Sequence, residues 1–194
     1  MFIQTEATPN PDVLKFLPGR DVMGEGTREF RSVVEAEASP LAQAIFELTD
    51  VRRVFFGPDF LTVTRAPQGR EWPQMKAPIL AAIMAHYTTD APLLRDAAAP
   101  AEPADGHDAA VYEGETAQIV AEIKELLDTR IRPAVAQDGG DITFSKFEPD
   151  TGIVWLHMRG ACSGCPSSSA TLKSGVENML KHYVPEVTRV EQAV

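Results

Sequence analysis

The C-terminal half of the chain is organised around one segment, which reads Arg159-Gly160-Ala161-Cys162-Ser163-Gly164-Cys165-Pro166-Ser167-Ser168-Ser169. An apolar, β-branched stretch, Ile153–Met158, precedes this segment and predicts a strand. An amphipathic stretch follows it, and Pro166 suits the first position of a helix because proline has no N–H to leave unpaired there. We therefore expect a tight loop between a strand and a helix, with Cys165 at the helix N-cap.

The residues on either side of this loop predict a small domain. Apolar residues at helical spacing indicate an amphipathic helix that begins near Thr116, and Gly139-Gly140 ends the helical region because glycine tolerates a positive φ. Strands at Ile142–Phe147 and Ile153–Met158 form a hairpin before the loop. A second helix over 172–183 and a last strand over 187–190 follow. The predicted order is α-β-β-α-β.

The N-terminal half also predicts a mixture of helices and strands. The β-branched and aromatic stretch Val51–Phe56 and the alternating stretch Phe60–Arg65 flank the turn residues Gly57-Pro58-Asp59, which is typical of a hairpin. Ser39 suits an N-cap, with Pro40 as the first helical residue. Weaker predictions are a helix over 75–87, which Pro78 either starts or kinks, and strands at Val13–Phe16 and Phe30–Val34.

A segment rich in alanine, proline and acidic residues separates the two halves. Residues 96–110 contain no large apolar side chain, so they have nothing to bury and predict a linker. Residues 96–115 carry six carboxylates and no lysine or arginine, and thus most of the chain's net charge of -10. The predicted class is α+β, with small domains at 1–95 and 116–194 joined by an acidic, flexible linker at 96–115.

Composition excludes several kinds of partner. An acidic chain without a basic stripe predicts no binding to nucleic acid or to anionic membrane surfaces. No apolar run approaches the roughly 20 residues of a membrane span. The first residues, Met1-Phe2-Ile3-Gln4-Thr5-Glu6, lack the features of a signal or transit peptide, and we therefore expect a cytoplasmic protein.

The two cysteines, Cys162 and Cys165, are the candidate functional residues. The positive end of the helix dipole favours a thiolate at Cys165. Iron–sulfur clusters take four thiolates and structural zinc takes four donors, whereas this loop supplies two. Two copies of the chain supply four. The count favours an iron–sulfur cluster shared across a homodimer, while half of a zinc site, a redox-active dithiol and two inert thiols stay open.

Longer motifs resemble a known family. The runs Ile131–Ile142 and Gly160–Lys173 resemble the C-terminal domain of the NifU family, over residues 116–194. The run Phe2–Pro11, together with Phe55–Phe60, is similar to the N-terminal domain of Nfu-type proteins. The resemblance implies a non-enzymatic scaffold or carrier in which Cys162 and Cys165 bind a [4Fe-4S] cluster between two protomers.

The same resemblance implies the partners. These are a second copy of the chain when the cluster is bound, apo-proteins that receive the cluster, and an upstream assembly machinery that supplies it. We expect residues 1–95 to dock the recipients. The alternative function is a thiol–disulfide oxidoreductase that uses the Cys162/Cys165 pair. Asp138 and Asp141, which flank the glycine pair, are expected to form capping or turn hydrogen bonds rather than to act in catalysis.

Overall fold

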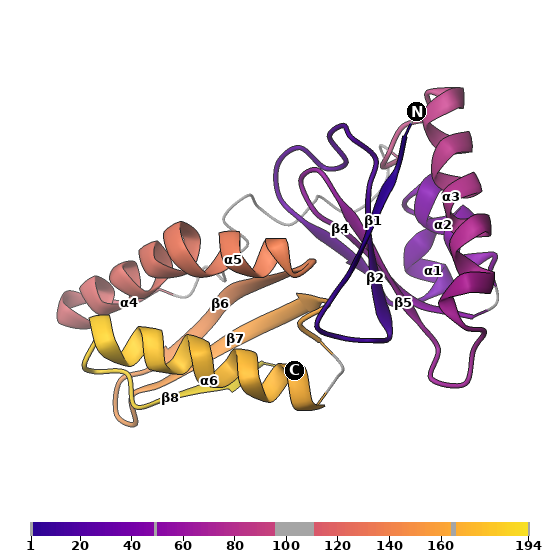
Figure 1. Ribbon diagram of the computed structural model, residues 1–194. Coiled ribbons are helices and arrows are strands. Elements are labelled where there is room, and N and C mark those ends of the chain that lie inside the picture. The colour runs from indigo at the N-terminus through magenta and orange to yellow at the C-terminus, as the bar shows by residue number, and fades with distance from the viewer. Residues whose placement is uncertain (1, 49, 96–110, 164–165, 194) are drawn as a thin grey trace. The chain divides into compact units, whose positions relative to one another are not determined.

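The computed structural model describes residues 2–48, 50–95, 111–163 and 166–193, except for the side chains of 166–169. The chain divides into two compact units, Met1–Ala104 and Asp105–Val194, and each has its own hydrophobic core (Figure 1). Both units contain helices and strands, which confirms the α+β class.

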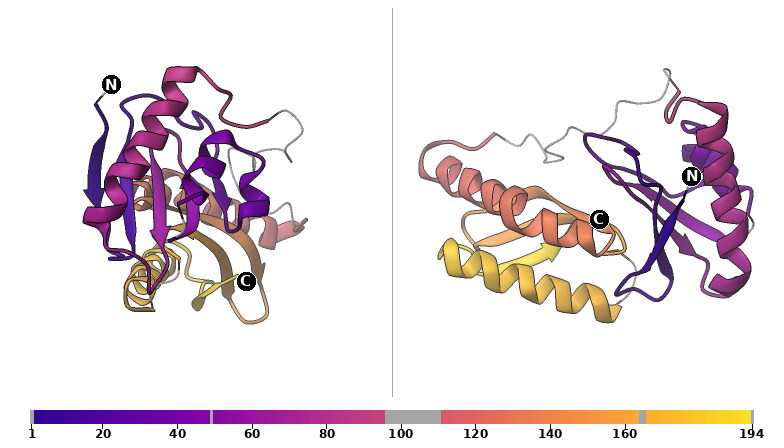
Figure 2. Two further views of the ribbon diagram at one scale, coloured as in Figure 1. Left: turned by 90° about the vertical axis from the view of Figure 1, so that its right-hand side faces the viewer. Right: turned by 45° about the horizontal axis from the view of Figure 1, so that its top comes forward.

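The N-terminal unit is an antiparallel sheet with helices on one face (Figures 1 and 2). The sheet has the strand order β1-β2-β5-β4-β3. Large apolar side chains from the strands and helices form its core. The strands are β1 (Gln4–Ala7), β2 (Val13–Leu17), β3 (Arg28–Phe30), β4 (Val51–Phe56) and β5 (Leu61–Arg65), and the helices are α1 (Val33–Ala36), α2 (Pro40–Phe46) and α3 (Trp72–Thr89).

The two strongest predictions for this unit are confirmed. Strands β4 and β5 pair as the expected hairpin, with Val54 opposite Val63 and Phe56 opposite Leu61. Helix α2 begins at Pro40, and the Ser39 hydroxyl accepts a hydrogen bond from the Ala42 N–H at 3.2 Å. Because Ser39 is fully buried, this bond satisfies an N–H that water does not reach.

Two weaker predictions need correction. The strand expected over Phe30–Val34 is wrong beyond Phe30, because the Ser32 hydroxyl accepts from the Glu35 N–H at 3.2 Å and caps the short helix α1. Helix α3 begins at Trp72, and Pro78 lies inside it rather than at its start. Pro73 occupies its first turn, where proline is tolerated.

The C-terminal unit is a sheet of three strands in the order β6-β7-β8, with its helices packed on one face (Figure 1). Strands β6 and β7 are antiparallel, and β8 pairs with β7 in parallel after the crossover through α6. The predicted order is confirmed, although β8 begins two residues later than expected. The elements are α4 (Gly114–Leu126), the π-helical segment η1 (Leu127–Ile131), α5 (Arg132–Gln137), β6 (Gly140–Glu148), β7 (Ile153–Gly160), α6 (Pro166–Tyr183) and β8 (Arg189–Gln192).

A π-helical turn interrupts the first helical region, which the sequence predicted to be continuous. In η1 the Arg132 N–H donates to the Leu127 carbonyl, five residues back, instead of four. The next residue, Pro133, has no N–H to donate. The wider turn therefore occurs where proline would break an α-helical ladder, and it changes the direction in which Arg132 projects.

Residues before the predicted boundary at residue 116 also pack on the core of this unit. The Tyr112 ring packs edge-on against Phe144, with 6.2 Å between ring centroids, and its hydroxyl accepts from the Phe147 N–H at 2.8 Å. Helix α4 begins at Gly114. The greater part of the predicted linker, residues 96–110, lies outside the described residues.

Replacement of Ser39 by alanine tests the buried cap. The Ala42 N–H loses its acceptor in a site closed to water, so we expect the free energy of unfolding to fall by about 1 kcal/mol. Ser32→Ala removes the corresponding cap of α1, which is exposed, and should cost less because water replaces the hydroxyl. Urea unfolding of both variants measures the difference, and equal losses would contradict this explanation.

Candidate functional site

Cys162 lies in a tight turn that follows strand β7. The Cys162 N–H donates to the Arg159 carbonyl at 3.3 Å, and the Ser163 N–H donates to the Gly160 carbonyl at 3.2 Å. Gly160 has a φ of +61°, which a side chain would disfavour. Helix α6 begins at Pro166, as predicted. Cys165, and with it the predicted N-cap, lies outside the described residues.

The Cys162 sulfur lies directly against Gly140, the first residue of β6. A β-carbon at Gly140 would overlap Cys162 Sγ and would lie 2.7 Å from the Arg159 carbonyl oxygen. The Ala161 N–H donates to the Gly139 carbonyl at 3.1 Å, which holds the turn onto the same strand end. Gly139, with φ +83°, ends the helical region as predicted, whereas Gly140 provides space for the sulfur.

The Cys162 side chain is 5% exposed and belongs to the core of the C-terminal unit. Burial, with smaller contributions from the Asp138 and Asp141 carboxylates, raises the pKa of Cys162 to about 12. The thiol is therefore protonated at neutral pH when no ligand is bound. The thiolate expected at Cys165 stays a prediction, because that residue lies outside the described residues.

Sequence reasoning missed the electrostatic effect of the two aspartates on Cys162. The prediction of a local hydrogen bond holds for Asp141, whose Oδ1 accepts from the Ile142 N–H at 2.9 Å. Among the described residues, no group of three or more histidine, cysteine, aspartate or glutamate side chains is placed to hold a metal ion.

Two known families match the two halves of the chain. The family described as "NifU-like domain" matches residues 123–191, and that described as "Scaffold protein Nfu/NifU N terminal" matches residues 3–90. NifU-like protein 5, mitochondrial, of Arabidopsis thaliana is 53% identical over 192 residues, which cover 99% of this chain and 68% of that protein. The chain belongs to the Nfu family of iron–sulfur cluster scaffold proteins.

Other relatives of this Nfu-family chain have similar identity. NifU-like protein 4, mitochondrial, of Arabidopsis thaliana is 54% identical, and the match covers 99% of this chain and 66% of that protein. The NFU1 iron-sulfur cluster scaffold homolog, mitochondrial, of Drosophila erecta is 50% identical, with 99% and 65% covered. The chain thus spans about two-thirds of the length of these relatives.

A solved structure also matches part of the chain. It is the solution NMR structure of a NifU-like protein from Saccharomyces cerevisiae, with 25% sequence identity and a TM-score of 0.45. The match covers 50% of this chain and 86% of that structure.

The expectation of a cytoplasmic protein is wrong by this comparison, because the relatives are named as mitochondrial proteins. We drew that expectation from the first residues of the chain, and those residues do not determine the compartment. Among the helices that the structure describes, none combines the length and the apolar character that a membrane crossing requires.

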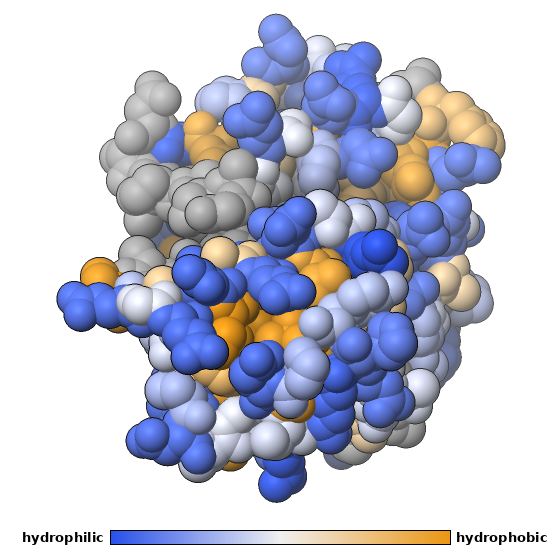
Figure 3. Space-filling model, turned by 90° about the vertical axis from the view of Figure 1, so that its left-hand side faces the viewer, coloured by the Kyte–Doolittle hydropathy of each residue, from blue (hydrophilic) through white to orange (hydrophobic). Residues whose placement is uncertain are grey.

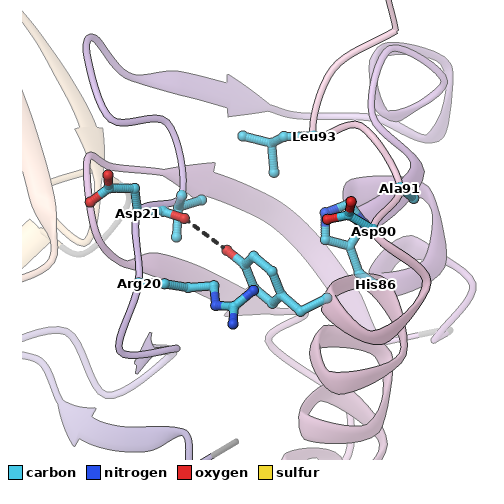
Figure 4. A pocket seen from close by; sticks show the side chains of 8 residues that line it. Arg20, Asp21, His86, Asp90, Ala91 and Leu93 are labelled. Atoms are coloured by element: carbon cyan, nitrogen blue, oxygen red, sulfur yellow. Dashed lines mark hydrogen bonds between the residues drawn. The ribbon is translucent and has the colours of Figure 1, made fainter.

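The N-terminal unit has a cavity of about 470 Å³ beside the end of α3 (Figure 4). The Tyr87 hydroxyl donates to the Asp21 carbonyl at 3.3 Å, and the Arg20 guanidinium lies 5.0 Å from the centroid of the Tyr87 ring. His86, which is 8% exposed, also lines the cavity, and burial lowers its pKa. No sequence pattern predicts this cavity, because its residues come from two distant segments.

The C-terminal unit also exposes apolar side chains. Figure 3 shows an apolar area on this unit with polar residues around it. On α6, Met179 and Tyr183 are 37% and 40% exposed, and the Tyr183 hydroxyl accepts from Arg130 Nη1 at 3.0 Å. These residues lie on the last two turns of α6, far along the helix from the cysteine loop at its start.

Replacement of Gly140 by alanine tests the packing of the cysteine turn. The added β-carbon must displace the Cys162 sulfur or the Arg159 carbonyl, so we expect a loss of about 3 kcal/mol in the free energy of unfolding. Gly175→Ala is the matched control, because its β-carbon would meet no atom within 4 Å and alanine favours the helix α6. The free energy of unfolding of this control should rise by about 0.5–1 kcal/mol. Thermal unfolding compares the two, and a neutral Gly140→Ala would show that the turn moves freely.

Proposed function

We propose that this Nfu-family chain binds a [4Fe-4S] cluster between two protomers and passes it to apo-proteins. Cys162 and Cys165 of each protomer supply the four thiolates. The ligand count carries the proposal: the cluster needs four sulfur ligands, and the chain has only two cysteines, three positions apart in the sequence. The cluster is cargo, so the role requires no catalytic residue.

The environment of Cys162 suits a ligand that is occupied and vacated in turn. Its thiol is buried and protonated at neutral pH when no iron is bound. Each iron–sulfur bond that forms at this residue therefore releases a proton, and each that breaks takes a proton up. Reprotonation makes return of the metal less favourable, which favours transfer over retention.

The same environment argues against the alternative, a thiol–disulfide oxidoreductase with Cys162 as the attacking thiol. Exchange needs an accessible thiolate whose pKa lies near the ambient pH. Cys162 is 5% exposed, and its pKa is raised to about 12. Insulin reduction assays on the colourless apo-protein test the alternative directly.

Iron and sulfide content, measured together with the mass of the loaded protein, test the shared cluster. We expect half a [4Fe-4S] cluster per protomer, a dimer when the cluster is bound, and mainly a monomer after the cluster is removed, because bridging links the dimer to the metal. Sedimentation of a loaded monomer would contradict the shared site.

The cysteine variants identify the ligands. Cys162→Ser or Cys165→Ala leaves two of four thiolates in a dimer, so either change should abolish stable cluster binding after reconstitution. Serine is preferred at position 162, because Cys162 packs in the core and alanine would leave a cavity there. Circular dichroism provides the control for folding. A full cluster in either variant would remove that residue from the ligand set.

We further propose that the N-terminal unit docks the recipient protein. It has its own core and contains no cysteine, so it supplies no thiolate. If residues 96–110, which precede the packed Tyr112, behave as a flexible coil, their r.m.s. span is roughly 20 Å. A recipient held by one unit is then within reach of the cluster at a raised effective concentration. The polar cavity beside α3 is the candidate contact.

Truncation tests this docking role. Residues 111–194 keep Tyr112, which packs on the core of the C-terminal unit, and we expect this fragment to bind the cluster. It should transfer the cluster more slowly than the full chain to a physiological recipient at low concentration, because the tether no longer raises the local concentration. Rates are compared with both proteins preloaded, and equal rates across several recipients would contradict docking.

A further inference from the structure

Arg132 forms a two-pronged ion pair with Asp141 next to the cysteine turn. Its Nε lies 2.9 Å from Asp141 Oδ1, and its Nη2 donates to Asp141 Oδ2 at 3.1 Å. The third nitrogen, Nη1, donates to Asp128 Oδ1 at 2.8 Å. The side chains of Arg132 and Asp141 are 15% and 6% exposed, so water screens the pair little. Parallel bonds of this kind fix the position of a carboxylate as well as its charge.

The pair joins the first residue of helix α5 to a residue near the start of the next element, strand β6. Arg132 is the first residue of α5, immediately after the π-helical turn, and Asp141 is the second residue of β6. The wide turn at η1 changes the register of the helix just before Arg132, where the side chain must reach back to the strand. Removal of Arg132 would take away an ion-pair partner of the buried Asp141 carboxylate. The loss of such a partner lowers the free energy of unfolding.

Asp141 transmits this constraint to the cysteine. Its Oδ1 also accepts from the Ile142 N–H, so both its backbone and its side chain are held at the start of β6. The preceding residue is Gly140, whose α-carbon lies against Cys162 Sγ. Across the sheet, Asp141 pairs with Arg159, and Gly140 pairs with Gly160, which is two residues before Cys162.

We propose that Arg132 is a positioning residue for Cys162: by holding Asp141 it fixes Gly140, and the fixed glycine keeps the sulfur of Cys162 in place and covered. The part of the proposal that concerns the bare cysteine is independent of the cluster. The part that concerns how long the cluster stays bound depends on the proposed function.

Alkylation of Cys162 by iodoacetamide tests the positioning in the apo-protein. The full chain carries Cys165→Ser so that only Cys162 reacts, and a buried thiol reacts only when the turn opens locally. Arg132→Met should make alkylation about tenfold faster, since the neighbouring strand end is no longer held. Arg132→Lys keeps the charge but not the two-pronged geometry, and it should fall between Arg132→Met and the parent.

A control separates positioning from general loss of stability. Tyr112→Phe removes the hydroxyl that accepts from the Phe147 N–H, at the opposite end of β6 from Gly140. This variant should lower the melting temperature and leave the alkylation rate of Cys162 unchanged. The direction of the change in alkylation rate is also informative. Loss of the Arg132 charge alone would disfavour the Cys162 thiolate and slow its alkylation. An unchanged or slower rate in Arg132→Met would overturn the proposal.

Cluster lifetime provides the second readout, in the full chain with both cysteines present. We expect a ferrous chelator to strip iron faster from loaded Arg132→Met than from the parent or from Tyr112→Phe. Equal stripping rates would overturn the role in retention. If the parent binds no cluster while Arg132→Met still alkylates faster, the proposed function fails and the positioning of Cys162 stands.

Discussion

The contact between the sulfur of Cys162 and the α-carbon of Gly140 is the constraint on which the cysteine site depends. It requires a residue without a side chain at the first position of β6, and it requires the turn after β7 to close onto that strand end. The hydrogen bond from the Ala161 N–H to the Gly139 carbonyl holds the turn against the start of β6. The sulfur consequently forms part of the hydrophobic core rather than projecting from a loop. Any movement of β6 relative to β7 therefore displaces the sulfur, because protein interiors are close-packed.

The residues that pack the turn also place charges around the sulfur. The end of the helical region brings Asp138 and Asp141 to the sulfur, and Arg132 brings a compensating charge to one of them. A cluster held by four thiolates adds negative charge to surroundings that already contain carboxylates. On the proposed function, such a site holds its cargo less firmly than a positively charged pocket would. Moderate affinity suits a carrier, which must release what it binds.

The sequence predicted elements well wherever a local pattern and the tertiary structure agree. The hairpin of β4 and β5 and the order of the C-terminal unit follow from alternation, turn residues and helical spacing. Strand β1 is largely exposed and polar and has no such pattern, so it was missed. The short apolar run Phe30–Val34 predicts a strand, but the chain forms helix α1 from Val33 onward with Ser32 as its cap. The role of Gly140 needed the strand register, since only the folded sheet places Cys162 against it. The assignment of Cys162 and Cys165 as cluster ligands stays a prediction, and Cys165 lies outside the described residues.

Cluster binding and thiol exchange make opposite demands on a cysteine, and the spacing of two cysteines cannot distinguish them. Exchange selects for exposure and a low pKa, so that a thiolate can attack. Ligation tolerates a buried thiol, because iron itself replaces the proton and stabilises the thiolate once bound. At Cys162 the burial and the neighbouring carboxylates both raise the pKa of the thiol and so disfavour a free thiolate. The residues around the sulfur, Gly140, Asp138 and Asp141, thus distinguish cluster binding from thiol exchange. The cysteine pair alone does not.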